Sequence, residues 1–160
     1  MRVTALLGAL ALCPTVIAAQ ASPNNSAWVG HWKLNVPASH IHAPGVKSET
    51  SEVPPNGGDT LAVKYMLTGM TGDNKPIDIS FDGKADGRPY PIMSGGQQIG
   101  TAAWHRKNSH QYTVEETLPG NTKESATLDM MKSDKRFTVH SHITTPQGTF
   151  DDTSVWDRTS

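Results

Sequence analysis

Alternation between apolar and polar residues, with a period of two, is the feature that most limits what this 160-residue chain can fold into. In QYTVEETL (111–118), Tyr112, Val114 and Leu118 alternate with threonine and glutamate. Successive side chains of a β-strand point to opposite faces, so this period predicts strands with one buried face. Three more stretches alternate in the same way: LAVKYMLT (61–68), PIDISF (76–81) and RFTVHSHI (136–143).

Turn-forming residues separate these stretches at short intervals. Gly, Pro, Asn and Asp supply the backbone angles that tight turns need. The longest irregular stretch, 36–48, contains Pro37, Pro44 and Gly45, and we expect a loop or a short helical turn there. The spacing predicts an all-β fold, a single antiparallel meander of about eight to ten strands forming a barrel or a sandwich. The expected turns are 54–59, 71–76, 82–87, 94–96, 118–121, 132–135 and 145–148.

The first 21 residues differ from the rest of the chain. Arg2 precedes a mostly apolar stretch, and Ala19-Gln20-Ala21 matches the small-residue pattern of a signal-peptide cleavage site. We interpret 1–21 as a signal peptide and 22–160 as one barrel domain, secreted or periplasmic, with no stable membrane anchor after cleavage. A retained anchor is disfavoured because the run is short and contains Pro14. Cys13 is the only cysteine, so the processed chain would have no disulfide and no cysteine metal site.

Composition and motifs exclude several classes of partner. Lys and Arg number 14 and Asp and Glu number 15, which leaves a net charge of -1. The sequence has no basic stripe or cluster of the kind that binds nucleic acid or an anionic membrane. It also has no P-loop, dinucleotide fingerprint, H-E-x-x-H or G-x-S-x-G pattern. We therefore expect no nucleic-acid partner and no cofactor, and the oligomeric state stays open.

The first and last expected strands carry a recognisable pair of motifs. Gly30 and Trp32 form a G-x-W pattern that continues into WKLN (32–35), and SVWDR (154–158) lies near the C-terminus. Together they resemble the calycin superfamily, which includes lipocalins and fatty-acid-binding proteins. The resemblance implies an up-and-down barrel in which Arg158 packs over Trp32 and closes one end, with Gly30 as part of this structural latch.

A closer likeness is to a group of secreted bacterial lipocalin-like proteins, most of them uncharacterised. The matching segments are WKLN, KSET (47–50), DGK (82–84), DGRPYP (86–91) and WDR (156–158), in that order. The likeness implies the barrel fold for the whole processed chain. Such a barrel holds either packed side chains or one small ligand. The group supplies no catalytic residues, so the chemistry must be judged from the residues of this chain.

Several aromatic residues fall on the face of the strands that is expected to point inward. Aromatic walls with polar tips suit a planar or hydrophobic small molecule, although each residue taken alone could also be ordinary core. We predict a small hydrophobic or aromatic ligand that enters beside the 36–48 loop. The expected ligand-binding residues are Tyr65, Trp104, Tyr112, Phe150 and Trp156.

Two acids, Glu116 and Asp152, interrupt this apolar face. A carboxyl group in an apolar setting must be paired, hydrogen-bonded or neutral, and burial raises its pKa toward the range of a general acid or base. With His40 or His42 of the long loop, such an acid would serve a cofactor-free isomerase, cyclase, lyase or hydrolase. The alternatives are a solvated position at the rim or an ion pair with an inward arginine such as Arg106. Whether the protein is an enzyme stays open at this point.

The histidines include two H-x-H pairs. His40 and His42 belong to the long loop, whereas His140 and His142 share the polar face of a predicted strand. Neighbouring imidazoles suit a metal ion, but all four could bind one only if loop and strand met. We predict no metal site and a solvated outer face for the second pair, and the question of metal binding at the two pairs stays open. His31 precedes an inward tryptophan, so we expect it to face solvent or a packed neighbour.

Overall fold

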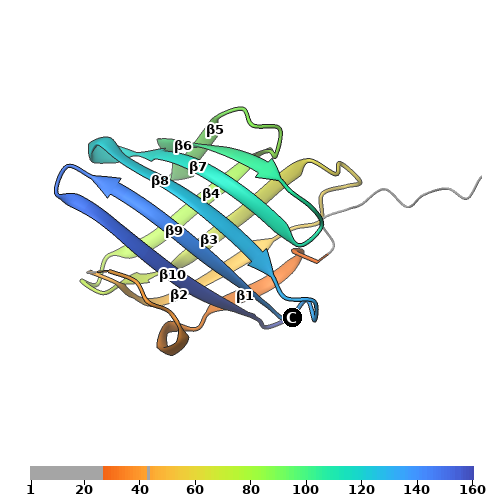
Figure 1. Ribbon diagram of the computed structural model, residues 1–160, viewed down its shortest axis with the longest axis horizontal. Coiled ribbons are helices and arrows are strands. Elements are labelled where there is room, and N and C mark those ends of the chain that lie inside the picture. The colour runs from red at the N-terminus through yellow and green to blue at the C-terminus, as the bar shows by residue number, and fades with distance from the viewer. Residues whose placement is uncertain (1–26, 43) are drawn as a thin grey trace, which may run out of the picture.

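The structure, a computed structural model, describes residues 27–42 and 44–160, and the predicted signal peptide lies outside the described residues. The strands form a closed barrel in which each strand is antiparallel to its chain neighbours and β10 pairs with β1 (Figure 1). This confirms the predicted all-β barrel and sets the number of strands at ten. The strands are β1 (Gly30–Leu34), β2 (Val46–Val53), β3 (Ala62–Thr71), β4 (Pro76–Lys84), β5 (Tyr90–Ser94), β6 (Gln97–Arg106), β7 (Gln111–Leu118), β8 (Thr122–Met130), β9 (Arg136–Thr145) and β10 (Gly148–Arg158).

Helical structure in the described part of the chain is limited to two 3-10 turns, η1 (Val36–Ala38) and η2 (Pro119–Asn121). Within the same residues, no helix is long and apolar enough to cross a membrane.

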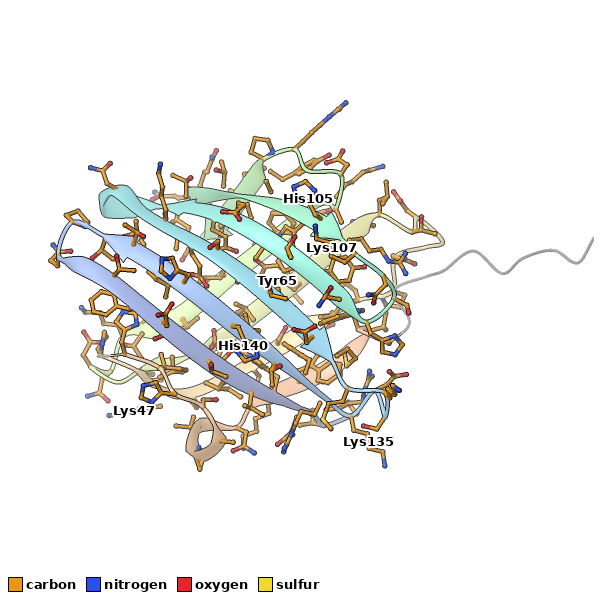
Figure 2. The ribbon with its side chains drawn as sticks, in the orientation of Figure 1. Lys47, Tyr65, His105, Lys107, Lys135 and His140 are labelled. Atoms are coloured by element: carbon orange, nitrogen blue, oxygen red, sulfur yellow. The ribbon has the colours of Figure 1, made fainter. Side chains whose placement is uncertain are left out.

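The alternating stretches form strands whose faces follow the predicted pattern. QYTVEETL coincides with β7, and its Tyr112, Val114 and Leu118 all face the inside of the barrel. Charged side chains cover the outside, as Figure 2 shows for Lys47 and Lys135, which are both exposed. Alternation thus separates an apolar interior from a polar surface, as in antiparallel sheets with one solvated face.

The connections of the meander alternate between the two ends of the barrel. We call one end the loop end, because it carries the long β1–β2 connection and the turns after β3, β5, β7 and β9. The turns after β7 and β9 lie at the left of Figure 1. We call the opposite end the latch end, because it holds Gly30, Trp32 and Arg158.

The latch end is closed by an arginine that packs on a tryptophan. Trp32 is fully buried, and the guanidinium of Arg158 lies 4.3 Å from its ring centroid. Arg158 also donates hydrogen bonds to three backbone carbonyls, those of Ala27, Val29 and Asp134. Gly30 has a φ of 137°, and a Cβ added there would meet the Arg158 guanidinium at 2.7 Å, so only glycine fits. His31 is exposed on the outer face.

The β1–β2 connection crosses the loop end and is fixed to β10. The expected short helical turn is present as η1, and the Asn35 side chain accepts a hydrogen bond from the Ala38 backbone N–H at 3.1 Å. His40 then pairs with Thr153 of β10 through two backbone hydrogen bonds of 2.7 and 2.8 Å. These bonds hold the residues that follow, including His42, against the end of the barrel.

Candidate functional site

The barrel encloses a cavity of about 390 Å³. Side chains from every strand except β1 line the cavity, together with Trp28 before β1 and Ile41 in the loop. Barrels of about eight strands have an interior that side chains or one small ligand just fill, so ten strands leave additional space. The volume lies in the range of roughly 300–1,000 Å³ that is typical of small-molecule sites.

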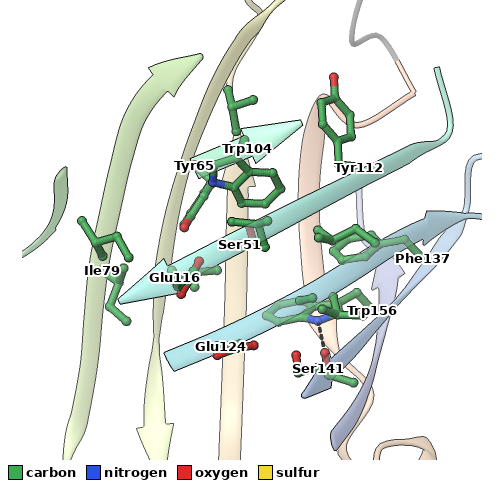
Figure 3. Close-up of a pocket in the computed structure, with 18 of the residues that line it drawn as sticks. Ser51, Tyr65, Ile79, Trp104, Tyr112, Glu116, Glu124, Phe137, Ser141 and Trp156 are labelled. Carbon is green, nitrogen blue, oxygen red and sulfur yellow. Dashed lines mark hydrogen bonds between the residues drawn. The ribbon is translucent and has the colours of Figure 1, made fainter. Parts of the chain in front are cut away.

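Aromatic rings form the half of the cavity nearest the latch end. Trp104, Tyr112 and Trp156, which the sequence predicts as ligand-binding residues, all line it (Figure 3). Trp156 stacks on Phe137 with centroids 5.7 Å apart and ring planes at 6°, and Trp28 meets Tyr112 edge-on at 5.3 Å. These contacts fix the rings, so this end of the cavity is a rigid aromatic floor.

Three glutamates line the cavity nearer the loop end. Glu116 of β7 lies directly opposite Glu124 of β8, and Glu49 comes from β2. Burial raises the pKa of Glu49 to about 7, and burial together with the nearby Glu124 raises the pKa of Glu116 to about 8. Burial also raises the pKa of Glu124, although a hydrogen bond with Ser141 opposes the rise. Near pH 7 Glu116 is therefore mostly a neutral acid, which both donates and accepts hydrogen bonds.

Tyr65, also predicted to bind ligand, extends from β3 into the space between these acids. Its ring stacks on Phe81 at 5.4 Å, and its hydroxyl points into the cavity with the Glu116 carboxyl (Figure 3). Burial raises the pKa of Tyr65, and the negative charges of Glu116, Glu124 and Glu49 raise it further. Within residues 27–42 and 44–160 the Tyr65 hydroxyl has no hydrogen-bond partner. The space in front of it is open to a polar group of a ligand.

Few positive charges in the described chain are placed to balance the carboxyl groups in the cavity. The carboxyl of Glu116 makes neither a hydrogen bond nor an ion pair with any described residue, so the expected alternative of an Arg106 partner is not observed. Lys64 is the only lysine or arginine among the lining residues of the described chain, and its ammonium lies 2.8 Å from Asp82 Oδ2 at the surface. The electrostatic character of the cavity is therefore set by acids.

Asp152, the second predicted acid, lines the cavity and holds the loop through His42. Its Oδ1 accepts a hydrogen bond from the His42 backbone N–H at 3.1 Å, and its Oδ2 lies 2.7 Å from the imidazole Nδ1. Because the carboxylate is an acceptor, we assign the imidazole proton to Nδ1. This leaves Nε2 as the acceptor nitrogen of the ring. Phe150, predicted as a ligand contact, is not part of the cavity lining and stacks on the His42 ring at 4.3 Å.

The remaining histidines of the two H-x-H pairs stay away from the cavity. His40 is exposed and pairs only its backbone with β10. His140 contacts a β10 hydroxyl, and His142 Nδ1 lies 2.7 Å from Asp151 Oδ1 on the outer face. In the part of the chain that the structure describes, no three His, Cys, Asp or Glu side chains are grouped so that they could hold a metal ion. Of the four histidines, only His42 meets a predicted acid.

Glu49 and Glu124 were missed by sequence reasoning. Each lies in a short polar run, KSET or TKES, so no apolar residue just before it marks the inward face as Tyr112 and Val114 do for Glu116. The residues that follow each glutamate nevertheless indicate which face of the strand points inward. Glu49 is two residues before Ser51 and four before Val53, and Glu124 is two before Ala126, all of which face the cavity.

Comparison with known proteins identifies the fold. Neither a protein-family model nor a curated protein matches this chain. Among solved structures, EF1p2_mFAP2b bound to DFHBI is similar with a TM-score of 0.52 and 15% identity, over 87% of this chain and 99% of that one. The redesigned β-barrel mFAP1 bound to DFHBI is similar with a TM-score of 0.50 and 17% identity, over 86% and 100% of the two chains. At this identity the likeness shows a shared barrel architecture and no more.

Proposed function

We propose that this protein binds a small, largely apolar or aromatic molecule inside its barrel. The observation that carries the proposal is the cavity of about 390 Å³, with an aromatic floor at one end and Tyr65 among carboxyl groups at the other. An unfilled cavity lowers the stability of the folded protein, because the atoms that line it lose packing contacts. A ligand that fills the cavity restores those contacts. The redesigned barrel mFAP1 carries DFHBI, which supports the idea that such an architecture can hold a bound molecule.

A neutral aromatic dye, N-phenyl-1-naphthylamine, tests the proposal. We expect its fluorescence to rise on binding, because the dye would leave water for an apolar site. Val139 lines the cavity, so Val139→Trp fills the cavity and should abolish the rise. The matched control is His140→Trp, because His140 is the next residue of β9 and points outward. Absence of binding by the wild-type protein, or equal binding by both variants, would reject an interior site.

A second candidate function, acid–base catalysis without a cofactor, is favoured by one specific contact. Asp152 lines the cavity and is bonded to His42, and this pair resembles the acid-oriented imidazole of many general bases. Glu116, with a pKa of about 8, lines the same cavity and could supply a proton there. Bound ligand kept in D2O and followed by NMR separates the two functions. Deuterium uptake or product formation that disappears in His42→Phe supports an enzyme, whereas an unchanged ligand supports a binding protein alone.

We also propose that the protein is exported, as a secreted or periplasmic protein released from residues 1–21. The support is the sequence of that segment, which ends at Ala19-Gln20-Ala21. Membership of the lipocalin-like group, suggested by the ordered motifs of the chain, belongs to the same proposal. The intact mass of the protein recovered outside the cytoplasm tests the export: a mass that begins at Ser22 supports it, and an uncleaved chain refutes it.

A further inference from the structure

We propose that the molecule bound in the barrel is an arylalkylamine, whose protonated amine lies between the Tyr65 hydroxyl and the carboxyl groups of Glu49, Glu116 and Glu124. This inference rests on the proposed function, since it names the class of ligand that the same cavity would take. It also gives the ligand a direction, with the aromatic ring on the floor at the latch end and the amine toward the loop end.

The Tyr65 hydroxyl is the first observation behind this inference. It lies deep in the barrel, points into the cavity, and has no hydrogen-bond partner among the described residues. Buried hydroxyls are normally satisfied by protein or by an ordered molecule. Glu116 has no partner either, although both groups face the same space. A group of the ligand placed between the two would satisfy both.

The negative charge of the acids in the cavity indicates which group of the ligand lies there. Glu49, Glu116, Glu124 and Asp152 come from four different strands, and Asp152 is the one already bonded to His42. A protonated amine offers three N–H donors and no acceptor, which matches a site made of one hydroxyl and several carboxyl oxygens. Above the pKa values of Glu49 and Glu116, a carboxylate ligand would instead meet acids of its own sign and be repelled. Charge complementarity therefore selects a cation over an anion.

The aromatic floor completes the selection. Trp104, Tyr112 and Trp156 present ring surfaces to the cavity, and such surfaces pack against apolar rings and attract a nearby cation. A ligand with a ring and a short alkyl chain ending in an amine would satisfy both halves of the cavity at once. A wholly apolar ligand would leave Tyr65 and Glu116 buried without partners, which costs about 1–3 kcal/mol for each group.

Binding of such a cation would depend on pH, because the acids that receive it change charge near neutrality. Glu116 is faced by Glu124 from β8. Tyr65 from β3 interacts with Glu116, Glu124 and Glu49 of β2, while Asp152 and His42 act on Glu124. The pKa values of Glu49 and Glu116, about 7 and about 8, mean that both carboxyls ionise as the pH rises through this range. An alkylamine stays protonated until about pH 10. Its affinity should therefore increase with pH up to that point.

Three probes that differ only in the terminal group test the inference: 2-phenylethylamine, 2-phenylethanol and phenylacetate. Each displaces N-phenyl-1-naphthylamine, and the displacement is measured at about pH 6 and about pH 8.5, on either side of the pKa values of the two acids. At the higher pH we expect the amine to bind about tenfold or more tightly than the alcohol, the value of one charge-assisted hydrogen bond. Phenylacetate should bind most weakly of the three.

Glu116→Gln should remove most of the preference for the amine while binding of 2-phenylethanol persists. Glu115→Gln is the matched control, because Glu115 is the next residue of β7 and is exposed on the outer face. Circular dichroism checks that both variants fold. If the dye binds but the amine binds no better than the alcohol, or phenylacetate binds best, the amine is refuted while the cavity remains a binding site. If neither the dye nor any of the probes binds, the proposed function fails as well.

Discussion

Replacing Glu116 by glutamine should make the protein more stable at alkaline pH. Burial raises the pKa of this carboxyl from its usual 4.5 to about 8 in the folded chain. Between these two values the folded state holds a proton that the unfolded state has lost. The folded state thus binds more protons, and stability falls as the pH rises. Glutamine keeps the shape of the side chain and does not titrate, so the variant escapes this loss.

The magnitude follows from the pKa values of the two states. At 1.36 kcal/mol per pH unit, a rise in pKa from 4.5 to about 8 corresponds to about 5 kcal/mol, which is an upper limit. Water in the cavity and the charge of the opposite Glu124 share the effect, so we expect about 2–4 kcal/mol near pH 8.5. Near pH 5 the folded state keeps its proton and the unfolded state is only about half a pH unit above its pKa of 4.5, so the difference should fall below about 1 kcal/mol.

Urea denaturation of the wild type, Glu116→Gln and the outward control Glu115→Gln at the two pH values measures these differences. The control should follow the wild type at both. A Glu116→Gln variant that is equal to or less stable than the wild type near pH 8.5 would refute a buried, unpaired carboxyl. A stabilisation of the same size at both pH values would also refute it, since the effect would then come from packing and not from the proton.

Three further outcomes are expected. Asp152→Ala removes both acceptors of His42, so hydrogen exchange of the His42 amide should accelerate about tenfold or more, and unchanged exchange would show that the loop is held elsewhere. Arg158→Ala removes three hydrogen bonds and the contact with Trp32 and should lower the free energy of unfolding by about 3 kcal/mol in urea titrations, whereas a loss below about 1 kcal/mol would contradict the latch. Gly69→Ala should destabilise the barrel by about 1–3 kcal/mol in thermal unfolding, because the new Cβ would lie 2.1 Å from a backbone oxygen of Ser48.

The fold could be predicted from the sequence because the signal for it is local. Alternation in QYTVEETL and RFTVHSHI fixes which side chains share a face, and closure of the sheet sends that face inward. Tyr112, Glu116 and Ser141 therefore reach the cavity where the pattern predicts. The sequence predicts only a range of eight to ten strands, because short strands such as β5 carry too few residues for a clear period.

The site was predictable only in part, because it depends on contacts between distant segments. Asp152 follows the period of its strand, but its bond to His42 joins residues 110 positions apart through a loop that has no period. Phe150 follows the same period, yet it is not part of the cavity lining, and its ring stacks on His42 of the loop. Glu124 was not predicted because it lies in the polar run TKES at the start of its strand, before Ala126 and Leu128 mark the inward face.

The Glu116–Glu124 pair argues for a ligand on energetic grounds. Directly opposite residues on antiparallel strands interact most strongly, and two like charges there are destabilising. The next inward pair along the same two strands is Val114 and Ala126, so this part of the sheet accepts apolar side chains without difficulty. Two apolar residues in place of the acids would avoid the desolvation of both carboxyls. Local features that oppose stability concentrate at functional sites, and the acids become favourable when a cation arrives between them and Tyr65.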